Sequence, residues 1–394
     1  MKRNIITTIR FEIGQVNVTV LEKLSTNTVE LFNVSSGTER THAFLARVFN
    51  EINAVIGGKV VDVTVVIDPV VKTNAQVKIH QEEIQLAGNE VTQLDIQNVL
   101  KLTKRRFETV NQKVILVQPI KFDVFDIMTK SYDRAPIHKK GDKLTVTSSV
   151  TTISIETYDF INQAVKSHGL NVSQILLKPQ TITQNNMSEH ILKTGAVMIH
   201  VGSNQSYITI NKNLSTLSLL SIYDYGYNKL VKGVRKVLGT SEEEAKNLLI
   251  VYGTLDKAKI NCVIFTRQEG INERIFYTKD LRKILESFYS KLFSVANKFI
   301  TQKGVERLPI VISGKTDQTD GLEEFSKEYF SSEHISKYNP ISYIELNEGN
   351  TEALGMKKFM ARMDKQMGVK YNTIVETNPH SVASLLTQRK TNKK

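Results

Sequence analysis

The 394-residue chain has only one cysteine, Cys262. It can form no internal disulfide, which fits a protein of a reducing cytosol. The chain also has no apolar run near the roughly 20 residues that a membrane-spanning helix needs. The start, MKRNIITTIRFEIG, carries basic residues but no long apolar segment before Glu12, so we expect no signal peptide.

Catalytic and nucleic-acid signatures are missing as well. The 8 histidines follow no metal-ligand spacing, and no Ser/His/Asp, HExxH or Cys/His arrangement stands out, so we assign no metal ligand and no catalytic residue. The formal net charge is +12, with basic clusters at 101–106, 139–143 and 389–394. No helix-turn-helix, zinc-finger or RNP-type motif accompanies them, and we expect no nucleic-acid partner.

What the sequence does contain is a repeated pattern of strands. Alternating apolar residues predict a three-stranded meander at 5–34, and the same pattern returns at 195–222. Gly14 and Gly202 mark the corresponding first turns. With 40% apolar residues the chain has enough for two cores, and we interpret the meanders as duplicated lobes.

Helices are predicted where the apolar period changes to 3.6 residues. One spans 41–56 before Gly57, and a longer one spans 279–302 before Gly304. Thr240 and Ser241 precede Glu243 and Glu244 with the spacing of a capping box, which starts a helix that runs to Gly253. We expect a further helix at 351–363, followed by a linker.

Residues 80–165 form a different unit in this interpretation. An amphipathic helix is expected at 95–107, and a second helix at 158–168. Between them lie two strands, 114–125 and 143–155, which a turn-rich segment separates. We therefore predict a small α+β insertion in the first lobe.

Glycine turns follow three of the expected strands, in the runs Glu12-Ile13-Gly14, His200-Val201-Gly202 and Ile312-Ser313-Gly314. One such turn is a weak signal, because glycine often ends a strand. Three of them in two duplicated lobes predict a nucleotide cleft between the lobes. An ordinary hairpin, with His200 ending its strand, is the alternative.

The run YDYGYNKLVKGVRKVLGTSEEEAKNLLIVYG, 223–253, resembles bacterial cell-division proteins of the FtsA family. The matching residues are Gly226, Leu238, Gly239, Thr240, Glu243, Glu244, Ala245, Tyr252 and Gly253. The insert is similar to the family's 1C subdomain at Pro136, Gly141 and Leu144, and the segment 351–355 is similar to the start of the family's final helix.

The resemblance implies an α/β, actin-like (ribonuclease H-like) duplicated two-lobe fold with a 1C-type insertion. The implied parts are subdomain 1A at 1–79 and 166–194, the 1C insert at 80–165, subdomain 2A at 195–226 and 305–366, subdomain 2B at 227–304, a linker at 367–378 and an amphipathic basic tail at 379–394.

The resemblance also implies ATP as a cofactor. The implied contacts are Glu12, Gly14, Gln15, Gly202, Ser203, Asn204, Gln205, Gly226, Lys246, Gly314 and Lys315. Family members carry an aspartate where this chain has Glu12 and His200, and more glycines in the turns. His200 is no hard anionic ligand for Mg²⁺, and the side chains of Ser203 and Asn204 crowd the backbone where a phosphate would press. We therefore expect weak ATP binding, little or no hydrolysis, and no assigned magnesium ligand.

The tail, ETNPHSVASLLTQRKTNKK, has the pattern of a short amphipathic helix with a basic end. Its apolar face comprises Val382, Leu385 and Leu386, and Arg389 and Lys390 follow. Such a helix suits an anionic membrane surface, and FtsA proteins end in a membrane-targeting helix. A disordered basic tail is the alternative.

The resemblance implies a cytoplasmic adaptor that binds the C-terminal peptide of FtsZ and tethers FtsZ filaments to the inner face of the membrane. The implied peptide-binding residues are Lys279, Arg282, Lys283 and Lys291, and self-association into filaments is expected. The alternatives are a pilus-assembly adaptor that binds a peptide of a membrane partner, and an active ATPase or sugar kinase of the same superfamily.

Overall fold

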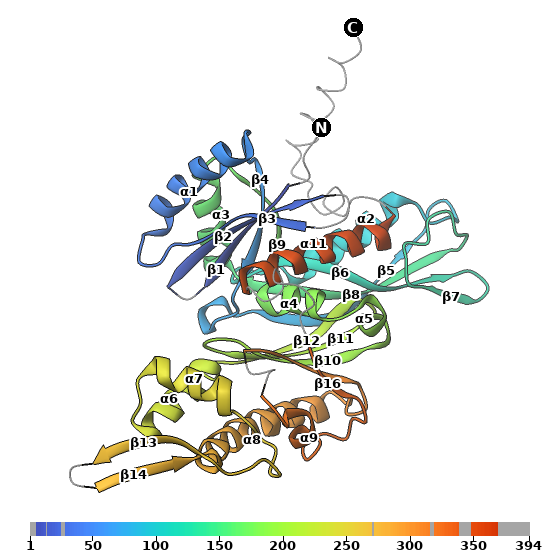
Figure 1. Cartoon of the computed structure of the whole chain (residues 1–394). Helices are drawn as coiled ribbons and strands as arrows, with labels where there is room; N and C mark the ends of the chain where they lie inside the picture. The colour runs from blue at the N-terminus through green and yellow to red at the C-terminus, as the bar shows by residue number, and fades with distance from the viewer. Residues whose placement is uncertain are drawn as a thin grey trace. The chain divides into compact units, whose positions relative to one another are not determined.

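The computed structural model of the chain describes residues 5–12, 14–24, 28–269, 272–315, 319–338 and 348–368. The chain divides into two compact units (Figure 1). The first unit consists of residues 1–185, 213–215 and 344–394, and the second of residues 186–212 and 216–343.

A five-stranded sheet in the order β3-β2-β1-β4-β9 forms the centre of the first unit. Its strands are β1 (Ile5–Glu12), β2 (Gln15–Lys23), β3 (Thr28–Ser35), β4 (Asp62–Ile67) and β9 (Asn171–Leu177). The meander β1–β2–β3 is antiparallel, whereas β4 pairs in parallel with both β1 and β9. The predicted first meander is confirmed, and β9 was not predicted.

Some helices of the first unit follow an apolar sequence period and others do not. They are α1 (Thr41–Ile56), the 3₁₀ turn η1 (Val71–Thr73), α3 (Ile155–Lys166), α4 (Lys178–Asn186) and α11 (Glu348–Met367). The bounds of α1 are those predicted, because Phe44, Val48 and Ile52 form a buried stripe and Gly57 ends the helix in the left-handed conformation. α4 is almost wholly buried although it is mostly polar.

The inserted segment forms its own four-stranded sheet, in the order β5-β8-β6-β7. Its elements are β5 (Gln76–Gln85), α2 (Gln93–Phe107), β6 (Gln112–Phe125), β7 (Thr129–Tyr132) and β8 (Lys143–Ser154). The predicted α+β insertion is confirmed. β5 and β7 were missed, so the insert begins near Gln76 and not at residue 80.

The last described helix, α11, requires a correction of a domain boundary. The resemblance to FtsA implies that residues 305–366 belong to the second lobe, but α11 belongs to the first unit. Its side chains Met356, Phe359 and Met363 are buried in one core cluster with Val66 of β4 and Leu176 of β9. The return segment 166–194 also ends earlier, since residues from Asn186 onward belong to the second unit.

The second unit repeats the arrangement of the first. Its sheet has the order β12-β11-β10-β15-β16, formed by β10 (Ala196–Val201), β11 (Ser206–Lys212), β12 (Ser215–Ile222), β15 (Ile310–Gly314) and β16 (Ile335–Lys337). As in the first unit, the strand that opens the meander pairs antiparallel with the next strand and parallel with a later one. The duplication read from the sequence is confirmed.

The remaining elements of the second unit surround this sheet. They are α5 (Glu189–Thr194), α6 (Tyr227–Leu238), α7 (Glu242–Tyr252), the hairpin β13 (Val263–Glu269) and β14 (Asn272–Tyr277), α8 (Thr278–Gln302) and α9 (Leu322–Ser326). The capping box of Ser241 and Glu244 is confirmed, and α8 agrees with its predicted span within one residue. The hairpin β13–β14 was not predicted.

Candidate functional site

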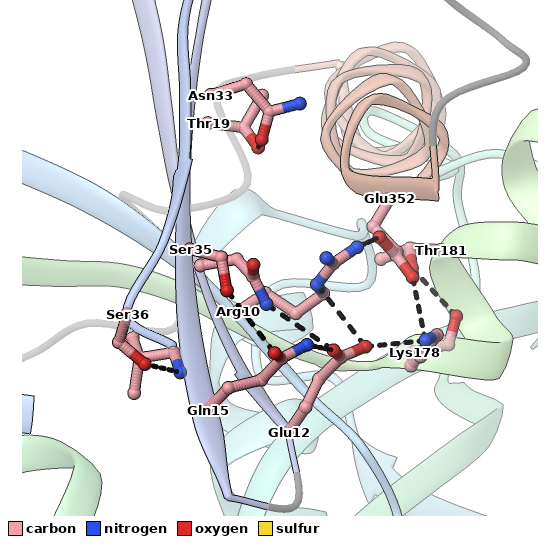
Figure 2. A network of polar contacts seen from close by, with 12 residues as sticks. Arg10, Glu12, Gln15, Thr19, Asn33, Ser35, Ser36, Lys178, Thr181 and Glu352 are labelled. Atoms are coloured by element: carbon pink, nitrogen blue, oxygen red, sulfur yellow. Dashed lines mark hydrogen bonds and ion pairs between the residues drawn. The ribbon is translucent and has the colours of Figure 1, made fainter. Parts of the chain in front are cut away.

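Glu12, the last residue of β1, lies in a network of charged side chains (Figure 2). Its Oε1 atom accepts from the Lys178 ammonium at 2.6 Å and lies 3.4 Å from Nε of Arg10. Its Oε2 atom accepts hydrogen bonds from the side-chain amides of Gln15, at 2.9 Å, and Asn17, at 3.4 Å. Donors from the chain itself therefore occupy both oxygens of the carboxylate.

A second carboxylate, that of Glu352 in α11, completes the network. It pairs with the Arg10 guanidinium, and its Oε1 atom lies 3.4 Å from Nζ of Lys178. Glu352 is 1% exposed and Lys178 5% exposed, so both charges are removed from water. Charges at this depth are stable only when they are paired, and here two acids face two bases.

The electrostatics of Glu12 follow from these contacts. Burial alone would raise the pKa of Glu12, but the charges of Lys178 and Arg10 and the hydrogen bonds from Lys178 and Gln15 outweigh burial. Together they lower the pKa from its ordinary value of 4.5 to about 2. The side chain is therefore an anion at neutral pH, and its charge is already compensated within the first unit.

The turn after β1 is held by side chains rather than left open. Gly14 has a φ of 76°, a left-handed conformation that glycine adopts without strain. The Gln15 amide donates to Glu12, and its oxygen accepts from the Ser35 hydroxyl at 3.3 Å. Both the nitrogen and the oxygen of the Gln15 side-chain amide therefore form hydrogen bonds to neighbouring residues of the sheet.

The corresponding turn of the second unit, residues 202–205, is closed by its own backbone. The N–H of Gly202 donates to the carbonyl of Gln205 at 3.0 Å. The first amides of α6 then bond back to the turn, with Tyr227 N–H on the Gly202 carbonyl and Asn228 N–H on the Ser203 carbonyl. These helix N–H groups would otherwise be donors for an anion.

Gly226 allows this close packing of α6 against the turn. A Cβ atom at Gly226 would lie 2.6 Å from backbone atoms of Gly202, Asn204 and Gln205. The side chains of Asn204 and Asn228 form a further hydrogen bond of 2.8 Å across the same contact. Gly226 therefore serves the packing of the turn, which is a reason for glycine that needs no phosphate.

His200 and Gln205 point into the protein. His200 is 7% exposed, its Nδ1 lies 3.0 Å from the Ser313 hydroxyl, and its ring stacks on Tyr207 with centroids 6.0 Å apart. The Gln205 amide donates to the Tyr207 hydroxyl at 2.8 Å. These polar side chains occupy the strand end where the sequence departs most from the FtsA pattern.

The third turn lies beside the second. Gly314 has a φ of 111°, and a Cβ there would lie 2.2 Å from the Val201 carbonyl oxygen. Lys315 follows, and its backbone N–H donates to that carbonyl at 3.1 Å. Lys246 is half-buried on α7 and pairs with Glu242 at 2.6 Å. Gly202, Gly226, Gly314 and Lys315 thus come together through the ends of β10 and β15 and the start of α6, whereas Lys246 is engaged within its own helix.

The described residues do not fit a magnesium ion. No group of three or more His, Cys, Asp or Glu side chains among them is placed to hold a metal. Glu12 is saturated by Lys178, Arg10 and amide donors, and His200 is directed at Ser313. Magnesium needs several oxygen ligands that remain open to the ion and its waters.

Known proteins resemble this chain both in sequence and in structure. Cell division protein FtsA of Neisseria meningitidis is 23% identical over 259 residues, which cover 64% of this chain and 61% of that protein. Cell division protein FtsA of Streptococcus pneumoniae is 22% identical over 284 residues, which cover 70% and 60%. The matched region thus spans about three fifths of these relatives. No protein-family model matches the chain.

Solved structures show the same fold at low sequence identity. The PilM-PilN type IV pilus biogenesis complex contains a chain with a TM-score of 0.54 and 10% identity, covering 90% of this chain and 98% of its own. MreB5 of Spiroplasma citri bound to ADP has a TM-score of 0.52 and 10% identity, with 91% and 98% coverage. The chain is an FtsA-like protein with the actin-like fold.

The four basic residues of α8 that the sequence predicts as peptide contacts lie in two places along the helix. Lys279 and Lys283 are exposed, and Arg282 between them is half-buried. Arg282 and Lys283 stand three and four positions after Lys279, so the three side chains lie on adjacent turns of the helix. The Nζ atom of Lys279 lies 5.3 Å from the centroid of the Tyr277 ring. Lys291 is farther along the helix, where its Nζ lies 5.6 Å from the centroid of the Tyr225 ring.

Sequence reasoning missed Arg10, Lys178 and Glu352. Lys178 stands 166 positions from Glu12 along the chain, and no motif spacing joins residues so far apart. A weak signal exists in the alternation Arg10-Phe11-Glu12, which places both charges on one face of a strand. The tail residues Val382, Leu385, Leu386, Arg389 and Lys390 lie outside the described residues. No described helix is both long and apolar enough to cross a membrane.

Proposed function

We infer that the chain is a cell-division adaptor that binds FtsZ and tethers its filaments to the inner face of the cytoplasmic membrane. The observation that carries this proposal is the sequence similarity to FtsA of two distant bacteria, over 64% and 70% of the chain. The actin-like fold agrees with it. In this proposal the protein is cytoplasmic, peripheral on the membrane at the division site, and self-associates into filaments.

The proposed docking place for the C-terminal peptide of FtsZ is the basic edge of α8. Lys279, Arg282 and Lys283 give a ridge of positive charge on a helix whose opposite face is buried in the core of the second unit. The Nε and one terminal nitrogen of Arg282 are buried without a hydrogen-bond partner among the described residues. An acidic group of the peptide would pair with the exposed ammonium groups of Lys279 and Lys283 beside it.

The proposed membrane contact is the tail, through its apolar residues 382, 385 and 386 and its basic end. Each aliphatic side chain contributes roughly 1.5–3 kcal/mol if it is fully buried. Each basic residue adds about 1 kcal/mol near an anionic surface. A single tail of this size binds weakly, but several tails in one filament bind together because each raises the effective concentration of the next.

ATP is proposed as a weakly held ligand that the chain hydrolyses little or not at all. MreB5 of Spiroplasma citri, which shares the fold, is described as bound to ADP. In this chain the N–H groups of Gly202 and Lys315 and the carboxylate of Glu12 are engaged in internal contacts. Fewer backbone donors then remain for the phosphates, and the described residues contain no acidic cluster placed to hold the metal. Catalysis falls steeply when the metal is misplaced.

Co-sedimentation tests the adaptor function directly. The full chain is centrifuged with FtsZ filaments, with anionic vesicles, and with both together. We expect FtsZ to join the vesicle fraction only when the chain is present. Binding to vesicles without recruitment of FtsZ would contradict the adaptor role and leave the pilus-assembly alternative, in which a membrane partner supplies the peptide. The likeness to the PilM-PilN structure supports the shared fold and does not favour that alternative further.

A further inference from the structure

The network around Glu12 places an ammonium group between two carboxylates. Nζ of Lys178 is 2.6 Å from Oε1 of Glu12 and 3.4 Å from Oε1 of Glu352 (Figure 2). The two acids come from β1 and α11, and the lysine is the first residue of α4. One positive group therefore bridges acids from separate elements, as a bound cation does.

The position of Lys178 at the start of α4 is unfavourable for a lysine considered alone. The N-terminus of a helix carries a partial positive charge and prefers an anion. Burial of the side chain adds a desolvation cost. The two carboxylates offset both terms, so the ammonium and the acids stabilise one another and none of them is dispensable.

The charges of the described side chains in this cluster balance one another. Arg10 and Lys178 contribute two positive charges, and Glu12 and Glu352 contribute two negative charges, so these four side chains sum to zero charge. A divalent ion beside Glu12 would have to displace Lys178 and leave a buried ammonium without its acid, which is strongly unfavourable.

We propose that Lys178 permanently holds the cation position beside Glu12 and Glu352, so that the first unit is assembled without Mg²⁺ and binds none at the end of β1. The ammonium joins β1, α4 and α11 in every state of the protein. A metal ion could join them only while it was bound.

The test replaces the ammonium and asks whether a metal can take over. In the Lys178→Met variant the two carboxylates keep Arg10 but lose Lys178, the other base that pairs with both of them. We expect a lower melting temperature that Mg²⁺ or Mn²⁺ partly restores. Electron paramagnetic resonance with Mn²⁺ should show a site in this variant that is at least about tenfold tighter than any in the unchanged protein. Adding Glu12→Gln to Lys178→Met should remove both the site and the rescue.

A matched control comes from α11. Lys358 donates to the carbonyl and side-chain oxygens of Asn185, at 3.1 and 2.8 Å. Lys358→Met should lower the melting temperature without any rescue by metal. A Lys178→Met variant that folds but gains no Mn²⁺ site would overturn the proposal.

A measurement on the unchanged protein keeps the proposal testable if Lys178→Met does not fold. Mn²⁺ titration of the full chain should show no site that Glu12→Gln abolishes, and its melting temperature should be the same in excess chelator and in millimolar Mg²⁺. A Glu12-dependent Mn²⁺ site in this protein would overturn the proposal.

Discussion

At the scale of single residues, the most consequential side chain is Glu12. Its folded-state pKa of about 2 lies below the ordinary value of 4.5. A depressed pKa means that the stabilising contribution is present above pH 4.5 and is lost as the pH falls from 4.5 towards 2. The Glu12 side chain should therefore stay ionised in the folded protein well below the pH at which exposed carboxylates protonate, while its contribution to stability already declines.

The variant Glu12→Gln should lose this contribution at neutral pH. It removes one acid from a buried cluster and leaves Lys178 with Glu352 alone, so we expect a loss of about 3 kcal/mol in the free energy of unfolding. Urea titrations at pH 7 and pH 3 should show that the difference from the unchanged protein shrinks at the lower pH. Glu243→Gln, at an exposed position on α7, should change stability by less than about 0.5 kcal/mol.

A second residue-scale prediction concerns Lys283 of α8. The proposed peptide contact depends on an exposed positive charge, so Lys283→Glu should weaken binding of the FtsZ peptide about five- to tenfold at low salt. Fluorescence anisotropy with a labelled peptide measures the affinity. Lys298→Glu makes the same charge change on the same helix about 22 Å away and should leave the affinity unchanged. Equal affinities for all three proteins would exclude this place on α8.

At the scale of elements, α11 is fastened to α4 along its length. Lys358 and Arg362 donate to carbonyls at the end of α4, at 3.1 Å each. A Cβ at Gly355 would lie 1.9 Å from the Thr181 carbonyl oxygen, so the two backbones are in direct contact there. The glycine permits this close approach of the two helices. Charged side chains of α11 contact α4 at both of its ends, Glu352 at the start and Lys358 and Arg362 at the end.

Gly355→Ala should therefore separate the two helices. The added methyl group meets backbone, which yields little, and we expect a loss of about 1–3 kcal/mol in stability and faster proteolysis of α11. Gly233→Ala is the matched control, since the Cβ at that helical glycine meets only Ile284 at 3.4 Å. It should be neutral or stabilising by about 0.5–1 kcal/mol. Unaltered stability of Gly355→Ala would contradict the packing described for α11.

Elements also show what the sequence predicts and what it does not. α1 and α8 were predicted because a buried apolar stripe repeats over several turns and capping signals mark an end. α4 has the sequence KPQTITQNN, which has no apolar period and so was not predicted. The helix can be buried although it is polar because its polar groups form hydrogen bonds with other elements. β7 has only 4 residues and gives too few alternations to be recognised, and β13, VIFTRQE, is apolar only over its first three residues.

At the scale of the whole molecule, the duplication and the actin-like fold were predictable from the sequence. The internal contacts made by the polar residues at the ends of β1 and β10 were not. The sequence identified Glu12 and His200 as departures from the FtsA pattern. It gave no indication of their partners, since Lys178 and Ser313 are distant in the chain. The membership of α11 in the first unit was missed for the same reason, as chain order does not determine which core a terminal helix joins.

Nucleotide binding is the prediction that belongs to this scale. A fluorescent ATP analogue titrated with and without Mg²⁺ should bind weakly, with dissociation constants that agree within about twofold, a difference of roughly 0.4 kcal/mol. A phosphate-release assay should show little or no turnover. Tight binding that requires Mg²⁺, or sustained release of phosphate, would contradict the assignment of Glu12 and His200 to internal contacts and favour an active ATPase.

Membrane attachment is the second whole-molecule prediction. Replacing Leu385 and Leu386 with glutamate removes the apolar face of the tail, at about 1.5–3 kcal/mol for each buried leucine, and should release the chain from anionic vesicles in flotation. Ser384→Glu with Gln388→Glu adds the same charge but keeps the leucines, so it should retain more of the bound fraction. Equal flotation of the leucine variant and the unchanged protein would refute the anchor.

The buried face of α11 is rich in methionine, and this makes the helix sensitive to oxidation. Met356, Met363 and Met367 are each at most 1% exposed. An oxidant reaches a thioether at this depth only when α11 detaches from the core of the first unit. The resulting sulfoxide is polar, which disfavours reburial of the side chain. The rate at which peroxide modifies these three sulfurs therefore measures how often the final helix detaches, and each such event leaves a permanent chemical mark on the protein.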